Sequence, residues 1–277
     1  MKIYNLNENV DVIVSYEDAV YFGSYDLEEG NKYGKIIKIR TKDLVERDPP
    51  DLEIDTSTPT TGTFDIIIWG SSLVSANTKD ISLYDKDLNL LQNTHTTSYN
   101  TFLASDGDFL FVSDGDGYIT VYNDNLEKTI CSKVSSDTLW VVGVHDGCVY
   151  CGGEEGVLYI LKKSNLSVID TINTGCGITS LYFEDGFFLL GSYDEHIYHI
   201  EYDLKIIKKT KIGGGVWRII KKEHQYVLSC MYEGVKIVDS DLNILSTLET
   251  GPLIYSLALI DDYVVFNTFY DRKLYLI

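Results

Sequence analysis

The sequence predicts an all-β fold, a seven-bladed β-propeller closed by the N-terminal strand, from three observations. Short runs of Val, Ile, Leu, Phe and Tyr alternate with Asp-Gly, Glu-Gly and Asn-Asp turns along the 277 residues, without any long helical periodicity. The final repeat stops after its third strand, at KLYLI. One hairpin turn recurs at intervals of 38 to 40 residues, at Asn77, Asp116, Glu154, Asp194, Glu233 and Asp271. A period near 40 with four short strands is typical of a WD-repeat-like propeller blade.

The first repeat is the least regular. Its turn, GSYDLEEGNKYG (residues 23–34), matches the recurring turn with an insertion, and residues 46–62 are expected to form a long connection in the first blade. The fifth repeat, residues 181–203, has the clearest three strands and two turns. Residues 2–6, KIYNL, precede the first complete repeat and can supply the fourth strand missing from the last one. We therefore expect one closed propeller domain over residues 1–277.

The chain is strongly acidic, with 42 Asp and Glu against 23 Lys and Arg and a net charge of −19. Such a field repels phosphate, so we expect neither nucleic acid nor an anionic membrane as a partner. It attracts cationic ligands or basic protein surfaces, although a charge that only keeps the protein soluble explains it as well.

Five cysteines are present, and none is set in a loop typical of a metal site. Cys148 and Cys151 form a C-x-x-C string inside an apparent strand, where residues three apart point to opposite faces. We expect five reduced thiols, a cytoplasmic location, and neither metal nor cofactor. No basic segment followed by an apolar core opens the chain, and no apolar run could span a bilayer, so neither a signal peptide nor an anchor is expected.

Unusual polar and aromatic residues fall at one predicted mouth of the channel. In an up-down blade the first strand starts where the second ends and the third begins, so these ends meet at one rim. The first strands start near Asp11, Asp65, Trp140, Ser180, Trp217, Arg218 and Tyr255. The turns between second and third strands add Tyr25, Tyr193, Asp194, Glu195, His196, Met231, Tyr232, Tyr270, Asp271 and Arg272. A scaffold does not require these residue types, so they indicate a site.

Several of these residues also have a purely structural interpretation. Asp194, in a Ser-Tyr-Asp turn, can tie that turn together. Arg218, on an innermost strand, needs an acidic partner and is either a scaffold salt bridge or an anion clamp. A histidine at a strand start, such as His196, is often structural. The DGD and DGDG strings (residues 106–108 and 114–117) lack the last acidic ligand of a calcium loop and lie where hairpin turns are required.

Five segments, in order and spacing, resemble the WD-repeat diphthine methyl esterases. They are LGSYDEHIYHIEYD (190–203), GGGVWRI (213–219), CMYEGVKIV (230–238), PLIYSLAL (252–259) and TFYDRKLYLI (268–277). The resemblance implies a seven-bladed propeller that hydrolyses the methyl ester of diphthine methyl ester on translation elongation factor 2, a step of diphthamide biosynthesis. The Trp-Asp dipeptides that usually close third strands are missing, and Tyr232 stands where we expect His in many members.

The implied substrate suits the residues at the mouth, and we expect the chain to act on it as a monomer. A quaternary ammonium binds aromatic faces, and ester hydrolysis needs a base and a donor for the oxyanion. The expected base is Asp194, Glu195 or His196. The expected oxyanion donor is Arg218 or Arg272. Cys230, at an apolar strand end, ranks below water as the nucleophile. The expected substrate-binding residues are Tyr193, Trp217, Tyr232, Tyr255, Tyr270, Asp271, Asp11 and Asp65.

Two other functions stay open at this stage. The chain could be a non-catalytic WD-repeat scaffold that docks proteins, or a reader of methylated lysine that uses an aromatic cage without a base. An aromatic pocket with one convergent acid–base group favours the esterase, whereas a flat, wide aromatic rim favours docking.

Overall fold

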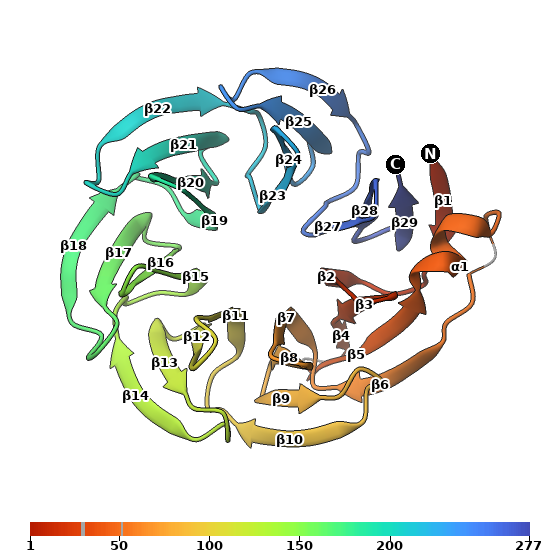
Figure 1. Ribbon diagram of the computed structural model, residues 1–277, viewed down its shortest axis with the longest axis horizontal. Helices are drawn as coiled ribbons and strands as arrows, with labels where there is room; N and C mark the ends of the chain where they lie inside the picture. The colour runs from red at the N-terminus through yellow and green to blue at the C-terminus, as the bar shows by residue number, and fades with distance from the viewer. Residues whose placement is uncertain (29–30, 51) are drawn as a thin grey trace.

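Seven antiparallel sheets stand as blades in a ring around a central channel, within residues 1–28, 31–50 and 52–277, which the computed structural model describes (Figure 1). Each blade has four strands running outward from the channel, and the first blade carries one additional short strand. The predicted seven-bladed β-propeller is confirmed.

The strands fall into four concentric layers. The innermost strands are β2 (Val10–Tyr16), β7 (Thr63–Trp69), β11 (Asn100–Ser105), β15 (Leu139–His145), β19 (Ile178–Glu184), β23 (Arg218–Lys222) and β27 (Leu257–Ile260). The second strands are β3 (Ala19–Ser24), β8 (Ser72–Asn77), β12 (Leu110–Asp114), β16 (Cys148–Gly153), β20 (Phe187–Ser192), β24 (Gln225–Ser229) and β28 (Tyr263–Thr268). The third strands are β5 (Asn31–Arg40), β9 (Asp80–Tyr84), β13 (Tyr118–Tyr122), β17 (Val157–Lys162), β21 (His196–Glu201), β25 (Val235–Asp239) and β29 (Lys273–Leu276). The outer strands are β6 (Thr56–Thr60), β10 (Leu90–His95), β14 (Lys128–Lys133), β18 (Val168–Asn173), β22 (Ile206–Lys211), β26 (Ile244–Leu248) and β1 (Lys2–Asn5).

The N-terminal strand closes the ring. β1 pairs antiparallel with β29, so that Tyr4 lies opposite Leu274, and the two termini lie side by side in Figure 1. The buried Tyr4 hydroxyl donates to the carbonyl of Leu44 at 2.7 Å. The predicted closure by residues 2–6 is therefore confirmed.

The first blade departs from the repeat, as its sequence does. The short strand β4 (Asp26–Glu28) pairs with β5 in an extended hairpin. The sequence predicted only a long connection over residues 46–62. The helix α1 (Thr41–Glu46) ends where that segment begins, and the outer strand β6 lies within it. Six residues are too few to show a helical period, which explains why the helix was not predicted.

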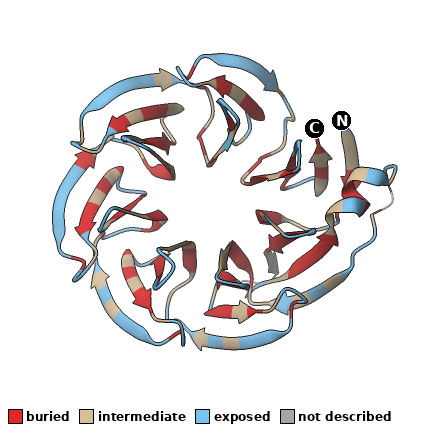
Figure 2. Ribbon diagram, viewed as in Figure 1, coloured by how far each residue is buried: buried red, intermediate tan, exposed pale blue. Residues whose placement is uncertain are grey.

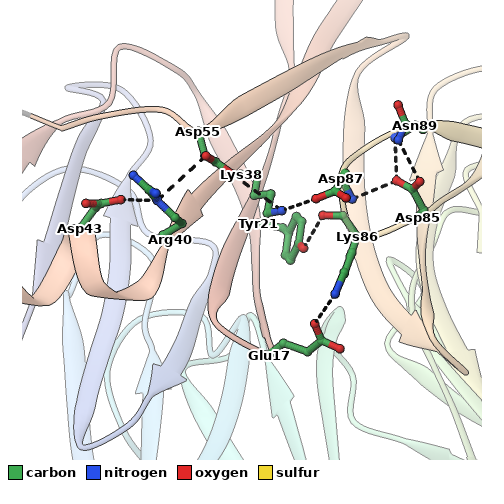
Figure 3. A network of polar contacts seen from close by, with 10 residues as sticks. All are labelled: Glu17, Tyr21, Lys38, Arg40, Asp43, Asp55, Asp85, Lys86, Asp87 and Asn89. Carbon is green, nitrogen blue, oxygen red and sulfur yellow. Dashed lines mark hydrogen bonds and ion pairs between the residues drawn. The ribbon is translucent and has the colours of Figure 1, made fainter.

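A polar network ties the first blade to the second at the rim opposite the strand-start mouth (Figure 3). The Lys38 ammonium bonds the Asp87 carboxylate at 2.8 Å, and the Tyr21 hydroxyl donates to the carbonyl of Lys86 at 2.8 Å. Tyr21 lies on the second strand and Lys38 on the third strand of the first blade, and both bond the turn after β9, so they stabilise the most irregular junction of the ring.

The core is divided among the junctions between blades. Seven hydrophobic clusters are found in the described residues, and each joins two neighbouring blades. One of them packs Ile13 and Phe22 of the first blade against Val265 and Leu274 of the last. Inner strands are largely buried and outer strands largely exposed, as Figure 2 shows. Because packing between blades supplies this burial, the channel-facing positions are left for other uses.

Candidate functional site

The residue at the start of each inner strand occupies a special position. In the first five blades the pairing between first and second strands skips one residue there, which forms a β-bulge. The register of the last two blades places Trp217 and Tyr255 at the same height. A bulge frees its residue from the regular ladder and changes the direction of the side chain. The seven residues at this position are Asp11, Phe64, Thr101, Trp140, Thr179, Trp217 and Tyr255.

These residues surround a cavity of about 120 Å³ at the mouth of the channel. Thr179 is the exception, since it is not part of the lining, and its hydroxyl donates to the carbonyl of Val216 at 2.5 Å. The cavity lining consists of Asp11, Tyr25, Phe64, Thr101, Phe102, Trp140, Tyr193, Trp217, Arg218 and Tyr255. Among the described residues, no three His, Cys, Asp or Glu side chains are placed to hold a metal ion.

Aromatic rings form most of the cavity wall. Contacts with ring centroids 4.9–5.8 Å apart link Trp140, Tyr193, Trp217, Tyr255, Phe269, Tyr25, Phe64 and Tyr99. The Trp140 indole donates to Glu154 at 2.5 Å, which fixes its ring. Gly177 leaves room for the ring of Tyr193, since a Cβ there would lie 2.5 Å from Cδ2 of that tyrosine. Such a wall of π-faces attracts cations.

One carboxylate, Asp11, is buried within this wall. Burial raises the pKa of Tyr25 and of Tyr255, and the negative charge of Asp11 raises both further. Burial and the charge of Glu154 likewise raise the pKa of Tyr193. The phenols therefore stay neutral, while Asp11 brings negative charge to the aromatic wall.

Arg218 crosses the channel to reach Asp65. Its Nη2 atom lies 2.6 Å from the Asp65 carboxylate, although the two residues belong to the sixth and second blades. The guanidinium lies 4.3 Å above the ring of Phe102, and the other carboxylate oxygen accepts the backbone N–H of Leu103 at 2.9 Å. Burial raises the pKa of Asp65, while the positive charge of Arg218 opposes that rise. Arg218 is part of the cavity wall. Asp65 is not part of the lining, so it acts on the cavity through Arg218.

The turn with Asp194 and His196 lies outside the cavity. Asp194 accepts hydrogen bonds from the Tyr198 hydroxyl at 2.5 Å and from Lys209 at 2.8 Å. His196 Nδ1 lies 2.7 Å from the Asp194 carbonyl. Burial acts to raise the pKa of the Asp194 carboxyl, but the bonds from Lys209 and Tyr198 outweigh it and keep the pKa below its usual value. This arrangement ties the turn to β22 and suits a structural role.

The remaining sequence-predicted residues lie on the rim. Tyr232 and Tyr270 are 55% and 64% exposed. Glu195 pairs with Lys211 at 3.2 Å. These side chains lie outside the cavity lining.

Two further rim residues belong to the turn of the last blade. Asp271 lies 3.7 Å from the ammonium of Lys273. Arg272 donates to Asn9 at 2.9 Å and lies 3.2 Å from Asp26, so it links the last blade to the first. Neither side chain reaches the cavity lining.

Cys230 is fully buried, and burial raises the pKa of its thiol to about 12. A thiol held this far from ionisation is a poor nucleophile at neutral pH. This agrees with its low rank in the sequence analysis.

Three lining residues were not among the sequence-predicted ones: Phe64, Thr101 and Phe102. The sequence analysis selected Asp65 at the start of the second blade, one residue beyond the position that faces the mouth. The bulge causes this difference, because it shifts the register by one residue. Alignment of the seven strand starts at this position would have found Phe64 and Thr101.

Comparison with known proteins shows the fold alone. No family model and no curated protein matches this chain. The chain is similar in structure to the crystal structure of the computationally designed Ika8 protein, with a TM-score of 0.69, 15% sequence identity, and coverage of 96% of this chain and 83% of that chain. In the part of the chain that the structure describes, no helix has the length and apolar character needed to cross a membrane.

Proposed function

We propose that this chain hydrolyses the methyl ester of diphthine methyl ester on translation elongation factor 2, a step of diphthamide biosynthesis. The observation that carries this proposal is the cavity, which combines an aromatic wall with the Asp11 carboxylate and the Arg218 guanidinium. The cytoplasmic location follows from the proposed partner. The exposed Tyr232 and Tyr270 would contact the loop that presents the modified histidine.

Binding is proposed to depend on the ammonium group of the substrate. Each aromatic face that a quaternary ammonium contacts contributes about 0.5–2 kcal/mol. Trp217 contacts both Tyr255 and Tyr193, so one group seated among them would touch several faces. The Asp11 carboxylate adds attraction of opposite charge.

Hydrolysis is proposed to use water as the nucleophile. Asp11 takes the proton from the water as its oxygen bonds to the ester carbon, and Arg218 donates to the resulting oxyanion. When the intermediate collapses, the carbon–methoxy bond breaks and the proton passes from Asp11 to the departing methanol. The product is first a carboxylic acid, which loses its remaining proton to water and becomes a carboxylate next to Arg218. This moves the proposed base from the Asp194–His196 turn to Asp11.

A second candidate function is recognition of a methylated cation without catalysis. Among the described residues, the cavity lining contains no histidine, and Asp11 is its one carboxylate. The absence of histidine is the observation that favours recognition. A methyl-lysine reader or a docking scaffold needs no base, and the same aromatic wall would serve it.

The test is release of methanol from methylated elongation factor 2 by the purified chain. Asp11→Asn should lower kcat about 10²–10⁴-fold because it removes the base and nearly preserves the shape. Asp116→Asn is the matched control, since this exposed turn carboxylate lies outside the cavity, and it should keep full activity.

The outcomes separate the two candidates. Tight binding of the methylated factor without methanol release favours recognition over hydrolysis. Full activity of Asp11→Asn would show that the base lies elsewhere. If the chain neither binds the methylated factor nor releases methanol, both candidate functions are refuted.

A further inference from the structure

A separate pocket, hereafter the Trp69 pocket, lies between the second and third blades at the rim opposite the mouth. It has a volume of about 300 Å³ and is lined by Trp69, Leu83, Gly107 and Asp124 together with residues 70–72. Trp69 ends β7 and Gly107 lies in the turn before β12, so the walls come from neighbouring blades. Gly107 and Asp124 are exposed, so the pocket opens to solvent.

The tryptophan in this pocket is more than the scaffold needs. Trp69 and Lys222 occupy the same position in their blades, since each is the last residue of its inner strand to pair with the second strand. The Trp69 indole donates to the carbonyl of Gly107 in the next blade at 2.9 Å. In the same way, the Lys222 ammonium donates to the carbonyl of Asp262 in the blade that follows it. Because a lysine can make this link between blades, the link alone does not require an aromatic ring.

The ring of Trp69 is held in place without loss of its faces to the hydrogen bond. The indole N–H lies in the plane of the ring, so its bond to Gly107 uses the ring edge. Trp69 and Leu83 both pack against the hydrophobic cluster between these two blades. A Cβ at Gly70 or at Gly107 would meet no atom within 4 Å outside the adjoining residues, so both turns leave open space. Tryptophan is the best of the aromatic side chains for contact with a cation.

The charge around the Trp69 pocket is negative. Asp124 belongs to the lining, and its carboxylate has no hydrogen bond or ion pair within the described part of the chain. Asp106 and Asp108 flank Gly107 in the adjoining turn, and Asp106 pairs with Lys163 at 2.6 Å. None of the described residues that line the pocket is a Lys or an Arg. A cationic group is therefore the electrostatic complement of this surface.

We infer that the Trp69 pocket binds an arginine side chain of a partner protein. The guanidinium stacks on Trp69 and donates to Asp124, because arginine combines a planar face with several N–H donors. A free amino acid fits less well, since no cation among the described lining residues can pair with its carboxylate. A basic segment of a protein also suits the net charge of −19. The pocket lies at the other rim from the proposed esterase site, and the inference does not rest on that function.

The test is a titration of the whole chain, followed by NMR of the three tryptophan indole N–H groups. Trp140 and Trp217 report on the cavity at the mouth, and Trp69 reports on the Trp69 pocket. The probes are acetyl-Gly-X-Gly-amide peptides in which X is arginine, lysine or citrulline, the uncharged analogue of arginine. The arginine peptide should shift the Trp69 signal to saturation and bind about 5-fold or more tightly than the citrulline peptide. The lysine peptide should lie between them, because it has the charge but not the planar group.

Variants assign the contacts to residues. Asp124→Asn should weaken binding of the arginine peptide about 2- to 5-fold, and this exposed position should not affect folding. Asp185→Asn is the matched control, since it removes an exposed turn carboxylate at the same rim in the fifth blade, and it should leave the affinity unchanged. Trp69→Leu should weaken binding about 2- to 5-fold, measured from the amide signals of Gly70 and Gly107.

Several results would overturn the inference. They are a Trp69 signal that does not saturate, equal affinities for the arginine and citrulline peptides, and an Asp124→Asn variant that binds as the wild type does. Shifts confined to Trp140 and Trp217 would also overturn it, because the peptide would then bind at the mouth. Equal effects of Asp124→Asn and Asp185→Asn would do so too, since the overall charge would explain them. Methanol release is not part of this measurement, so failure of the esterase proposal leaves the inference intact.

Discussion

Removal of Arg218 should destabilise the folded chain strongly, and much less if Asp65 is removed with it. The Asp65 side chain is 3% exposed, and its carboxylate has Arg218 as its positively charged partner at 2.6 Å. Breaking a buried ion pair by removing one partner costs about 3–5 kcal/mol, since the other group keeps an uncompensated charge. We expect a loss of this size in the free energy of unfolding for Arg218→Met near neutral pH.

The double variant Asp65→Asn/Arg218→Met leaves no buried charge. The new amide oxygen can still accept the N–H of Leu103, which now donates to Asp65 at 2.9 Å. What is lost is the contact of the guanidinium with Phe102 and part of the hydrogen bonding, together about 1–2 kcal/mol. The double variant should therefore be more stable than the single one, although it carries more changes.

The reasoning also predicts in which direction the stability of Arg218→Met changes with pH. Burial already raises the pKa of Asp65 in the folded chain, and loss of Arg218 must raise it further. Above the unfolded pKa of about 3.9 the folded state then binds more protons than the unfolded state, so stability falls as pH rises. The fall ends once pH passes the folded pKa. Because Asp65 of the wild type also has a raised pKa, the cost of Arg218→Met should grow only between the folded pKa of the wild type and that of the variant, by up to about 1.4 kcal/mol for each pH unit.

The assay is urea unfolding, followed by tryptophan fluorescence, of the wild type and of both variants between about pH 5 and pH 8. The double variant lacks the titrating group, so its cost should not show the rise of the single variant. Equal costs for the two variants, or a single variant whose cost is independent of pH, would refute the reasoning.

Three smaller predictions use the same kind of measurement. Tyr4→Phe should lower the free energy of unfolding in urea by about 1 kcal/mol, because it removes the bond to the Leu44 carbonyl. An unchanged midpoint would show that this bond does not stabilise the closed ring. Lys236→Met should cost about 1–3 kcal/mol in thermal unfolding, because the buried ammonium donates to the Ile212 carbonyl at 2.6 Å, and stabilisation would contradict this. The pKa of Asp194 is lowered by folding, so its contribution is present above about pH 4 and is lost as pH falls through the folded pKa. The stability difference between wild type and Asp194→Asn should therefore shrink in acid, and a difference that grows would be inconsistent with that sign.

Most of the fold could be predicted from local signals. The recurring turns fix the repeat, and alternating apolar residues fix the strands between them, so seven blades and the closing role of residues 2–6 follow from sequence. The first blade was predicted least well, because α1 is too short to show a period and β4 extends a hairpin whose length no local rule limits.

The candidate site was harder to predict, since it depends on register and on the direction of side chains. Tyr193 reaches the cavity, yet Asp194 and His196, one and three residues further along, are held by the turn and by Lys209. A sequence pattern places a residue at a rim but does not say toward which side of the turn it points. The ion pair of Arg218 with Asp65 joins residues 153 positions apart, and no periodic signal connects them.

The residue at the start of each inner strand, which is bulged in the first five blades, explains how a symmetric scaffold holds an asymmetric site. Most neighbouring positions in the strand take part in the ladder and in the packing between blades. This residue stands outside the regular ladder in the first five blades, and its type varies around the ring: Asp, Phe, Thr, Trp, Thr, Trp and Tyr in chain order. Substitutions there should change what the cavity binds while the fold is kept. Thr101 is an exception, because its buried hydroxyl donates to the Leu139 carbonyl at 2.5 Å, and exchange for a carboxylate would remove that bond.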